Sequence, residues 1–139
     1  MEPDEKDESL AEAFWSVARR LRHLSREALA PWDVTPSQSR AVGVLARRGT
    51  MRLSELALHL RIAPRSATEV VDDLQEAGLV ERLPDPHDRR ATLVQLTDRG
   101  VEVGAAIRAA RAAEAESYFG VLSDADRKDL TRILRTLRG

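Results

Sequence analysis

Two adjacent arginines, Arg89 and Arg90, follow a turn-forming segment rich in proline and aspartate, residues 84–88. Residues 79–83 before this segment and residues 91–97 after it have the composition and alternation of β-strands. The sequence therefore predicts a β-hairpin whose first strand ends at Pro84 and whose tip is basic. Guanidinium groups at such a tip can enter a narrow, electronegative groove, and the minor groove of DNA is one.

The residues before the hairpin indicate two short helices joined by a tight turn. Residues 53–60 carry an apolar stripe, and we expect Ser54 to be their N-cap. Pro64 suits the first position of a second helix, and Gly78 suits its end. Its expected buried residues recur at helical spacing: Ala67, Val70, Val71 and Leu74. Helix, turn, helix and hairpin in this order predict a winged helix-turn-helix.

The second helix of such a lobe enters the major groove of DNA and presents its N-terminal residues to the base edges. The residues at these positions are Arg65, Ser66, Thr68 and Glu69. Taken alone, an apolar helix pair is more often plain core, and an arginine pair in a loop is more often solvated surface. Their occurrence in tandem favours DNA binding over either reading.

Five short segments stand out by their order and spacing: residues 34–40, 53–57, 70–74, 78–82, and Asp88–Arg90 followed by a strand that ends in Leu96-Thr97. Together they resemble the MarR (multiple antibiotic resistance regulator) family of winged helix-turn-helix transcription factors over nearly the whole chain. The last of them is similar to the family's wing signature.

This resemblance implies a homodimer that binds double-stranded DNA at a near-palindromic operator. It implies that Arg90 enters the minor groove, that Arg89 contacts a phosphate and that Asp88 braces the wing loop. It also implies a repressor of nearby genes that a small aromatic or lipophilic effector releases from DNA.

The charge distribution bears on this function, because a net charge of −1 is unusual for a DNA-binding protein. Residues 1–12 hold six acidic residues and one lysine, which is a local net charge of −5. Residues 40–66 hold six arginines against Glu55 alone. Four acidic residues fall on the expected recognition helix, and we expect those beyond its first turn to face solvent or brace arginines: Glu69, Asp72, Asp73 and Glu76.

Composition argues against several other classes of protein. The chain has no cysteine, which excludes disulfides and thiolate metal sites and favours the cytoplasm. It has no apolar run of membrane-spanning length, and its acidic N-terminus is unlike a secretory signal. The three histidines lack metal-ligand spacing, and no glycine-rich phosphate loop or nucleophile elbow occurs. We therefore expect no enzyme, no metal and no cofactor.

Long amphipathic helices are expected on both sides of the lobe. Residues 9–29 and a helix opened by Ser123 carry apolar stripes, and an alanine-rich helix capped by Thr97 runs between the lobe and the last helix. One small lobe cannot cover so much apolar surface, which favours a two-fold dimer. The predicted organisation is an acidic disordered tail (1–8) and one domain (9–139). Within that domain, dimerisation helices (9–34 and 101–139) flank a winged helix-turn-helix lobe (35–100).

Four residues are candidates for lining an effector pocket: Phe14, Trp15, His23 and Trp32. Such pockets are mostly apolar with a few directing polar groups, although these side chains would more often be core anchors. The fold class predicted is mainly α-helical with a small antiparallel β wing. The rival to DNA binding is a winged-helix module that binds only proteins.

Overall fold

The computed structural model describes residues 7–139, so most of the predicted disordered tail lies outside the described residues. The chain forms two compact units, which we describe separately: Ala28–Ala109, and Met1–Glu27 with Ala110–Gly139. Both are mainly helical, and the first also holds a small antiparallel sheet, which confirms the predicted fold class. No helix within residues 7–139 is both long and apolar enough to cross a membrane.

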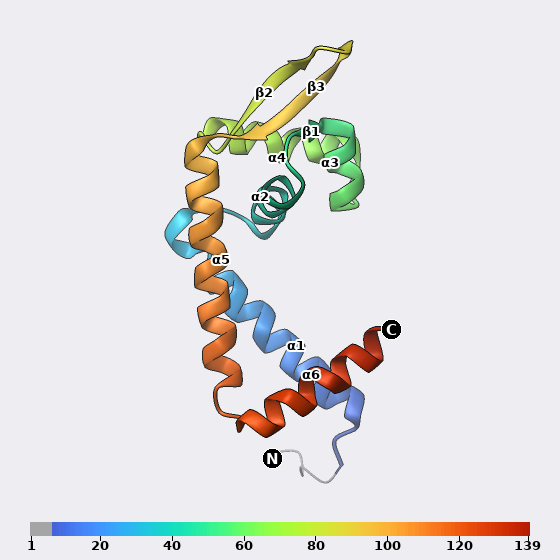
Figure 1. Cartoon of the computed structure of the whole chain (residues 1–139), viewed down its shortest axis with the longest axis vertical. Helices are drawn as coiled ribbons and strands as arrows, with labels where there is room; N and C mark the ends of the chain where they lie inside the picture. Colours follow the sequence, from blue (N-terminus) through green and yellow to red (C-terminus); the bar gives the residue numbers. More distant parts are fainter. Residues whose placement is uncertain (1–6) are drawn as a thin grey trace. The chain divides into compact units, whose positions relative to one another are not determined.

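The unit Ala28–Ala109 is the winged helix-turn-helix lobe (Figure 1). Its elements in chain order are η1 (Ala30–Trp32), α2 (Pro36–Arg48), β1 (Met51–Arg52), α3 (Leu53–Leu60), α4 (Pro64–Glu76), β2 (Val80–Asp85), β3 (Asp88–Leu96) and the first part of α5 (Asp98–Phe119). The other unit contains α1 (Leu10–Glu27), the rest of α5 and α6 (Asp124–Arg138).

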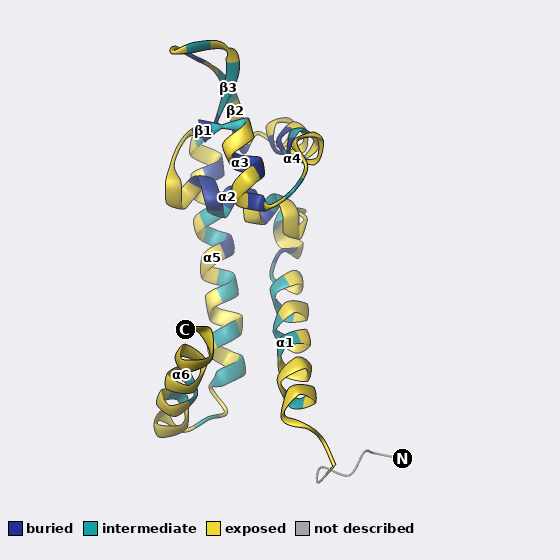
Figure 2. Cartoon of the chain, turned by 90° about the vertical axis from the view of Figure 1, so that its right-hand side faces the viewer, coloured by how far each residue is buried: buried dark blue, intermediate teal, exposed yellow. Residues whose placement is uncertain are grey.

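The core of the lobe lies between α2, α3, α4 and the sheet, and most of the residues that Figure 2 colours as buried belong to these elements. Of the residues expected to bury the second helix, Ala67, Val71 and Leu74 are buried and Val70 is half-buried. The largest fully buried side chains come from every one of these layers: Leu56, Leu74, Val42, Val71, Val80 and Val94.

Local capping signals start α2. The hydroxyl of Thr35 accepts the N–H of Gln38 at 3.1 Å, and the Gln38 side chain accepts the N–H of Thr35 at 3.1 Å. Pro36 occupies the first helical position, where its missing N–H costs nothing. At the other end of the helix-turn-helix, Gly78 follows the end of α4 with a φ of 77°.

The prediction that Ser54 caps α3 is wrong. α3 begins at Leu53, and its N-cap residue is Arg52, which makes no side-chain capping hydrogen bond. Arg52 is also the last residue of β1 and pairs with Leu93 of β3. The sheet therefore fixes the backbone entering α3, and the helix starts one residue before the capping residue that local chemistry favours.

The sheet has the order β1-β3-β2, with both pairs antiparallel. β2 continues through Pro84, which lies opposite Thr92, to Asp85, so the prediction that this strand ends at Pro84 is wrong. Proline is tolerated because β2 is an edge strand, where one side needs no ladder donor. The register shifts between Pro84 and Asp85, immediately before the turn of the hairpin.

The helices α1 and α6 contain no buried residue, and Figure 2 colours them mostly as exposed. Their apolar stripes are nevertheless as regular as predicted. Among the exposed apolar side chains, Leu10 is 88% exposed and Leu137 is 74% exposed. In α5, the hydroxyl of Thr97 accepts the N–H of Gly100 at 3.0 Å, as expected of its N-terminal cap.

Candidate nucleic-acid interface

The first turns of α4 present the predicted base-reading residues on the side opposite the core. Arg65, Ser66 and Glu69 are exposed, whereas Ala67 between them is fully buried. Thr68 is half-buried, and its hydroxyl donates to the carbonyl oxygen of Pro64 at 3.1 Å. Its donor is therefore occupied within the helix, and its oxygen keeps its capacity to accept.

The N-terminus of α4 is open to an anion. Ala63 is the N-cap residue and makes no side-chain capping hydrogen bond, and Pro64 has no N–H. The first N–H groups of the helix are therefore left without a side-chain cap, beside the exposed guanidinium of Arg65. Such a helix end favours a phosphate through its N–H groups and its dipole.

The turn between α3 and α4 is held by three hydrogen bonds. Arg61 adopts a left-handed backbone conformation, with φ 55° and ψ 45°. Its N–H donates to the carbonyl of Leu58 at 3.2 Å, and the N–H of Ile62 donates to that of Ala57 at 3.2 Å. The guanidinium of Arg40 donates to the carbonyl of Leu60 at 2.8 Å. These contacts fix the direction in which α4 leaves the turn.

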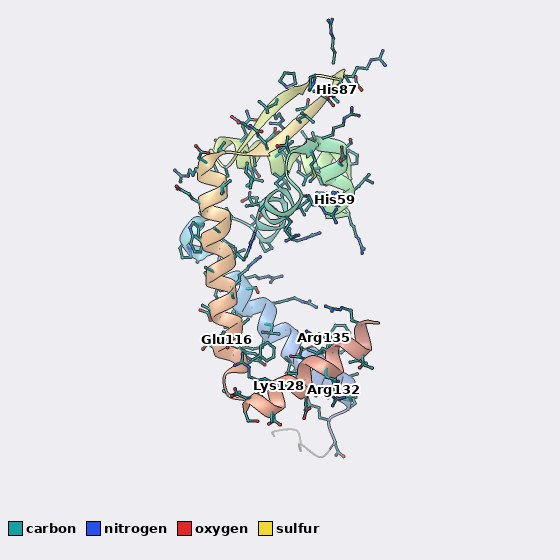
Figure 3. The ribbon with its side chains drawn as sticks, in the orientation of Figure 1. His59, His87, Glu116, Lys128, Arg132 and Arg135 are labelled. Carbon is teal, nitrogen blue, oxygen red and sulfur yellow. The ribbon has the colours of Figure 1, made fainter. Side chains whose placement is uncertain are left out.

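The tip of the wing carries Arg89 and Arg90, both of them exposed. Asp88 precedes them, and its carboxylate accepts the backbone N–H of Arg90 at 2.9 Å. His87 also lies at the tip, where Figure 3 labels it. The backbone N–H of His87 donates to the carboxylate of Asp85 at 2.9 Å.

Asp85 is the buried charge of the wing, at 7% exposure. Besides the N–H of His87, its carboxylate accepts the Nε–H of Arg52 at 2.8 Å. The hydrogen bond from the His87 backbone and the ion pair with Arg52 outweigh the effect of burial, so the pKa of Asp85 lies below its ordinary value of 3.8. The carboxylate stays ionised and ties the wing tip to β1.

Arg82 ties the base of the wing to the recognition helix. Its guanidinium donates to Asp72 at 2.6 Å and to Gln75 at 2.7 Å, and both acceptors lie on α4. Two roles were expected for the acidic residues of this helix, and Asp72 takes one of them because it forms an ion pair with an arginine. Glu69 and Glu76 take the other role and face solvent.

Sequence reasoning missed Arg52, Asp85 and Arg82 as members of this site. Asp85 is separated from Arg52 by 33 residues, and Arg82 from Asp72 by 10. These pairs depend on strand register and on where the hairpin leaves α4. The one local signal was Asp85, which the turn segment holds in addition to Asp88.

The candidate effector residues fall in both units. Phe14 and Trp15 are about half exposed on α1 and contact each other edge to face, with ring centroids 5.9 Å apart. The Nε2 of His23 lies 3.0 Å from a carboxylate oxygen of Glu27. Trp32 belongs to η1 in the lobe, where it is half-buried. Among residues 7–139, no three His, Asp or Glu side chains gather closely enough to hold a metal ion.

Comparison with known proteins agrees with this geometry. The model of the MarR family matches residues 32–91, from η1 into β3. An uncharacterised HTH-type transcriptional regulator of Mycobacterium leprae is 35% identical over 125 residues, covering 88% of this chain and 82% of the relative. An HTH-type transcriptional regulator of Mycobacterium tuberculosis is 37% identical over 102 residues, covering 73% and 68%.

Solved structures agree over almost the whole chain. The crystal structure of RV1404 from Mycobacterium tuberculosis has a TM-score of 0.83 and 30% identity, with 98% of this chain and 97% of that one covered. Wild-type MarR from E. coli in its apo form shares the fold, with a TM-score of 0.82 at 24% identity over 94% and 96% of the two chains. The chain is thus a member of the MarR family of DNA-binding winged helix-turn-helix transcription regulators.

Proposed function

We propose that this regulator is a homodimeric repressor of nearby genes that reads a near-palindromic operator. Each copy inserts α4 into a major groove, with Arg65, Ser66, Thr68 and Glu69 toward the base edges. Arg90 enters the adjacent minor groove, and Arg89 contacts a phosphate. Half-sites about one helical turn apart, roughly 10 bp, suit a two-fold dimer with this lobe.

The observation that carries the proposal is that one compact lobe exposes arginines at two places, the first turn of α4 and the tip of the wing. The first turn of α4 offers Arg65 and open N–H groups, and the wing offers Arg89 and Arg90. The ion pairs of Arg82 and Asp85 connect the wing to α4 and to β1 respectively. These ion pairs limit the motion of the backbone that carries the exposed arginines, so less conformational entropy is lost when they bind DNA.

Dimerisation is supported by the unit that contains α1 and α6. Neither helix buries a residue in the single chain, although each carries a regular apolar stripe. The exposed apolar side chains of the two helices are Leu10, Phe14, Trp15, Val17, Ile133, Leu134 and Leu137. A second copy would remove this surface from water and would set the spacing of the two α4 helices.

The proposal is tested by selecting operators from a random duplex library and measuring affinity by fluorescence anisotropy. Arg90→Ala is expected to weaken the selected operator by about 5- to 150-fold, which corresponds to about 1–3 kcal/mol. Arg108→Ala, which removes an exposed arginine from α5, is the control and should bind like the wild type. Affinity should fall steeply with salt, because phosphate contacts release counterions. No preference for any duplex would refute the function.

The effector part of the proposal rests on the exposed Phe14–Trp15 pair and His23 in one unit, and separately on Trp32 in the other. An effector acts only if it binds the DNA-competent and incompetent dimers with different affinity. Trp15 and Trp32 are the only tryptophans, so Trp15→Phe leaves Trp32 as the sole reporter of a titration with benzoate. We expect a saturable fluorescence change together with release of DNA. Unchanged fluorescence and DNA binding at millimolar benzoate would count against an aromatic acid.

A further inference from the structure

The polar face of α6 carries a row of cations that the DNA-binding function does not use. An open surface hollow of about 620 Å³ is lined by residues of α6 alone: Arg127, Lys128, Thr131, Arg132, Arg135 and Thr136. Figure 3 shows Lys128, Arg132 and Arg135 along this helix. We call these four cations and two threonines the α6 basic face.

The spacing on the α6 basic face places like charges next to one another. Lys128 and Arg132 are four residues apart, and Arg132 and Arg135 are three apart, so both pairs are neighbours on the helix surface. The helix dipole favours cations near the C-terminus, which accounts for Arg135, but it disfavours them near the start of the helix. Lys128 lies close to that start, since α6 begins at Asp124. A segment of negative charge would therefore find a complementary surface on this face of α6.

Carboxylates among the described residues neutralise only part of the row. Glu116 lies 2.6 Å from Arg127 and raises the pKa of that guanidinium. Asp129 reaches Arg132 only at 3.8 Å, with both side chains mostly exposed. Within residues 7–139, Lys128 and Arg135 have no carboxylate within ion-pair distance. The threonine hydroxyls are directed back to the helix, since Thr131 donates to the carbonyl of Arg127 at 2.8 Å.

The chain itself supplies a segment of complementary charge. Residues 2–8 hold five carboxylates and one lysine, and they lead into α1, which belongs to the same unit as α6. A tethered segment acts at a high effective concentration, so that weak individual ion pairs can add up to binding. Seven extended residues reach about 25 Å, which is longer than the α6 basic face at 1.5 Å per helical residue.

We propose that the acidic N-terminal segment, residues 2–8, docks on the α6 basic face and neutralises it. This contact would fix the end of α1 relative to α6 and would cover cations that otherwise attract nucleic acid without sequence preference. It is separate from the contacts of α4 and the wing, so it can be tested whether or not the proposed operator binding holds.

The lysines of the chain make a sharp crosslinking experiment possible. The chain has only two lysines, Lys6 in the N-terminal segment and Lys128 in α6. A carbodiimide joins lysines to carboxylates, so every such link that does not involve Lys6 identifies a carboxylate close to Lys128. We expect a Lys128 link to a carboxylate of residues 2–8 in the full-length protein at low salt. The link should disappear at about 1 M salt, where the Debye length is about 3 Å. Lys128→Arg keeps the charge and should abolish the link.

Asp124 provides an internal control, because it precedes Lys128 by one helical turn and should link to it in every sample that retains the lysine. Links from Lys128 to Asp124 without any to residues 2–8 at low salt would overturn the proposal.

A measurement of thermal stability supplies a second readout. The variant Asp4→Asn with Glu5→Gln should lower Tm by a few degrees at low salt and leave it unchanged at high salt. The matched control removes the same charge from exposed positions of α5, Glu102→Gln with Glu114→Gln, and should not lower Tm. Equal changes in the two double variants would contradict docking at the α6 basic face.

Discussion

Arg82 and Asp72 form an ion pair at 2.6 Å that joins the base of the wing to the recognition helix. Gln75, one turn further along α4, accepts a second hydrogen bond from the same guanidinium at 2.7 Å. The planar fork of arginine thus engages two acceptors at once, which fixes an angle as well as a distance. The orientation of β2 is therefore coupled to that of α4.

Replacing Arg82 by alanine should reduce DNA affinity more than stability. The pair is partly exposed, so its loss should cost less than about 1 kcal/mol of folding free energy. A wing that no longer keeps its angle to α4 should lose part of the contribution of Arg90, about 1 kcal/mol or more of binding free energy. Chemical denaturation and anisotropy on the selected operator measure the two quantities.

The matched control for Arg82 is its neighbour Glu81, whose side chain accepts a hydrogen bond from Gln95 within the sheet and, among the described residues, forms no hydrogen bond or ion pair with α4. Glu81→Ala should leave operator affinity nearly unchanged. Wild-type affinity in Arg82→Ala would mean that the wing keeps its angle without α4.

The backbone hydrogen bond from His87 and the ion pair with Arg52 predict a specific pH dependence for Asp85. The folded-state pKa of Asp85 is depressed, so the carboxylate stabilises the protein above its unfolded-state pKa, and this stabilisation is lost as pH falls through the folded value. Asp85→Asn should therefore be less stable than the wild type near neutral pH. The difference should stay constant down to about pH 5 and shrink only below the ordinary aspartate pKa near 4. Thermal unfolding across pH 3–7 measures it, and a difference that vanishes near pH 6 would implicate another group.

Features encoded within a few residues of one another could be predicted from the sequence. The start of α2 depends only on neighbouring residues, because its capping box closes within one turn. The residues that define it are Thr35, Pro36 and Gln38. Pro64 and Gly78 likewise bound the recognition helix as predicted. The winged helix-turn-helix itself followed from the order of such elements.

Features that depend on distant pairing could not be predicted in this way. Ser54 lost the N-cap position because Arg52 pairs with Leu93 across the sheet. The partners of Asp85 and Arg82 are set by register and by the exit angle of the hairpin, which no local pattern encodes. The sequence identified which residues of α4 and the wing tip are candidates for the site. The side chains that hold these two elements in place could be identified only in the structure.

Two glycines near the start of α5 allow this helix to pack closely against Leu79 and Val42. A Cβ on Gly100 would lie 2.0 Å from the carbonyl oxygen of Leu79, and one on Gly104 would lie 2.9 Å from a methyl group of Val42. Gly100→Ala should destabilise the protein by about 3 kcal/mol or more, since a backbone atom cannot move aside easily. Gly104→Ala should cost less, because a methyl group can shift and alanine favours helix by about 1 kcal/mol.

Gly43 in α2 is the control for these substitutions, since a Cβ there meets only the flexible end of Arg47 at 3.3 Å. Gly43→Ala should stabilise the protein by up to about 1 kcal/mol through helix propensity. Urea unfolding of the three alanine variants gives the order directly. A Gly100→Ala protein as stable as Gly43→Ala would contradict close packing of α5 on Leu79.

The proposed dimer can be tested with two leucines of matched exposure. Leu137 on α6 is 74% exposed and Leu58 on α3 is 77% exposed. If α6 buries its stripe against a second copy, Leu137→Asp removes about 1.5–3 kcal/mol of burial per copy and adds a charge to the interface. We expect analytical ultracentrifugation to find a monomer, with operator affinity lost because the half-sites are no longer bound together. Leu58→Asp lies outside the proposed interface and should remain dimeric. A wild-type monomer at micromolar concentration, or equal dissociation of both variants, would exclude α6 as the dimer contact.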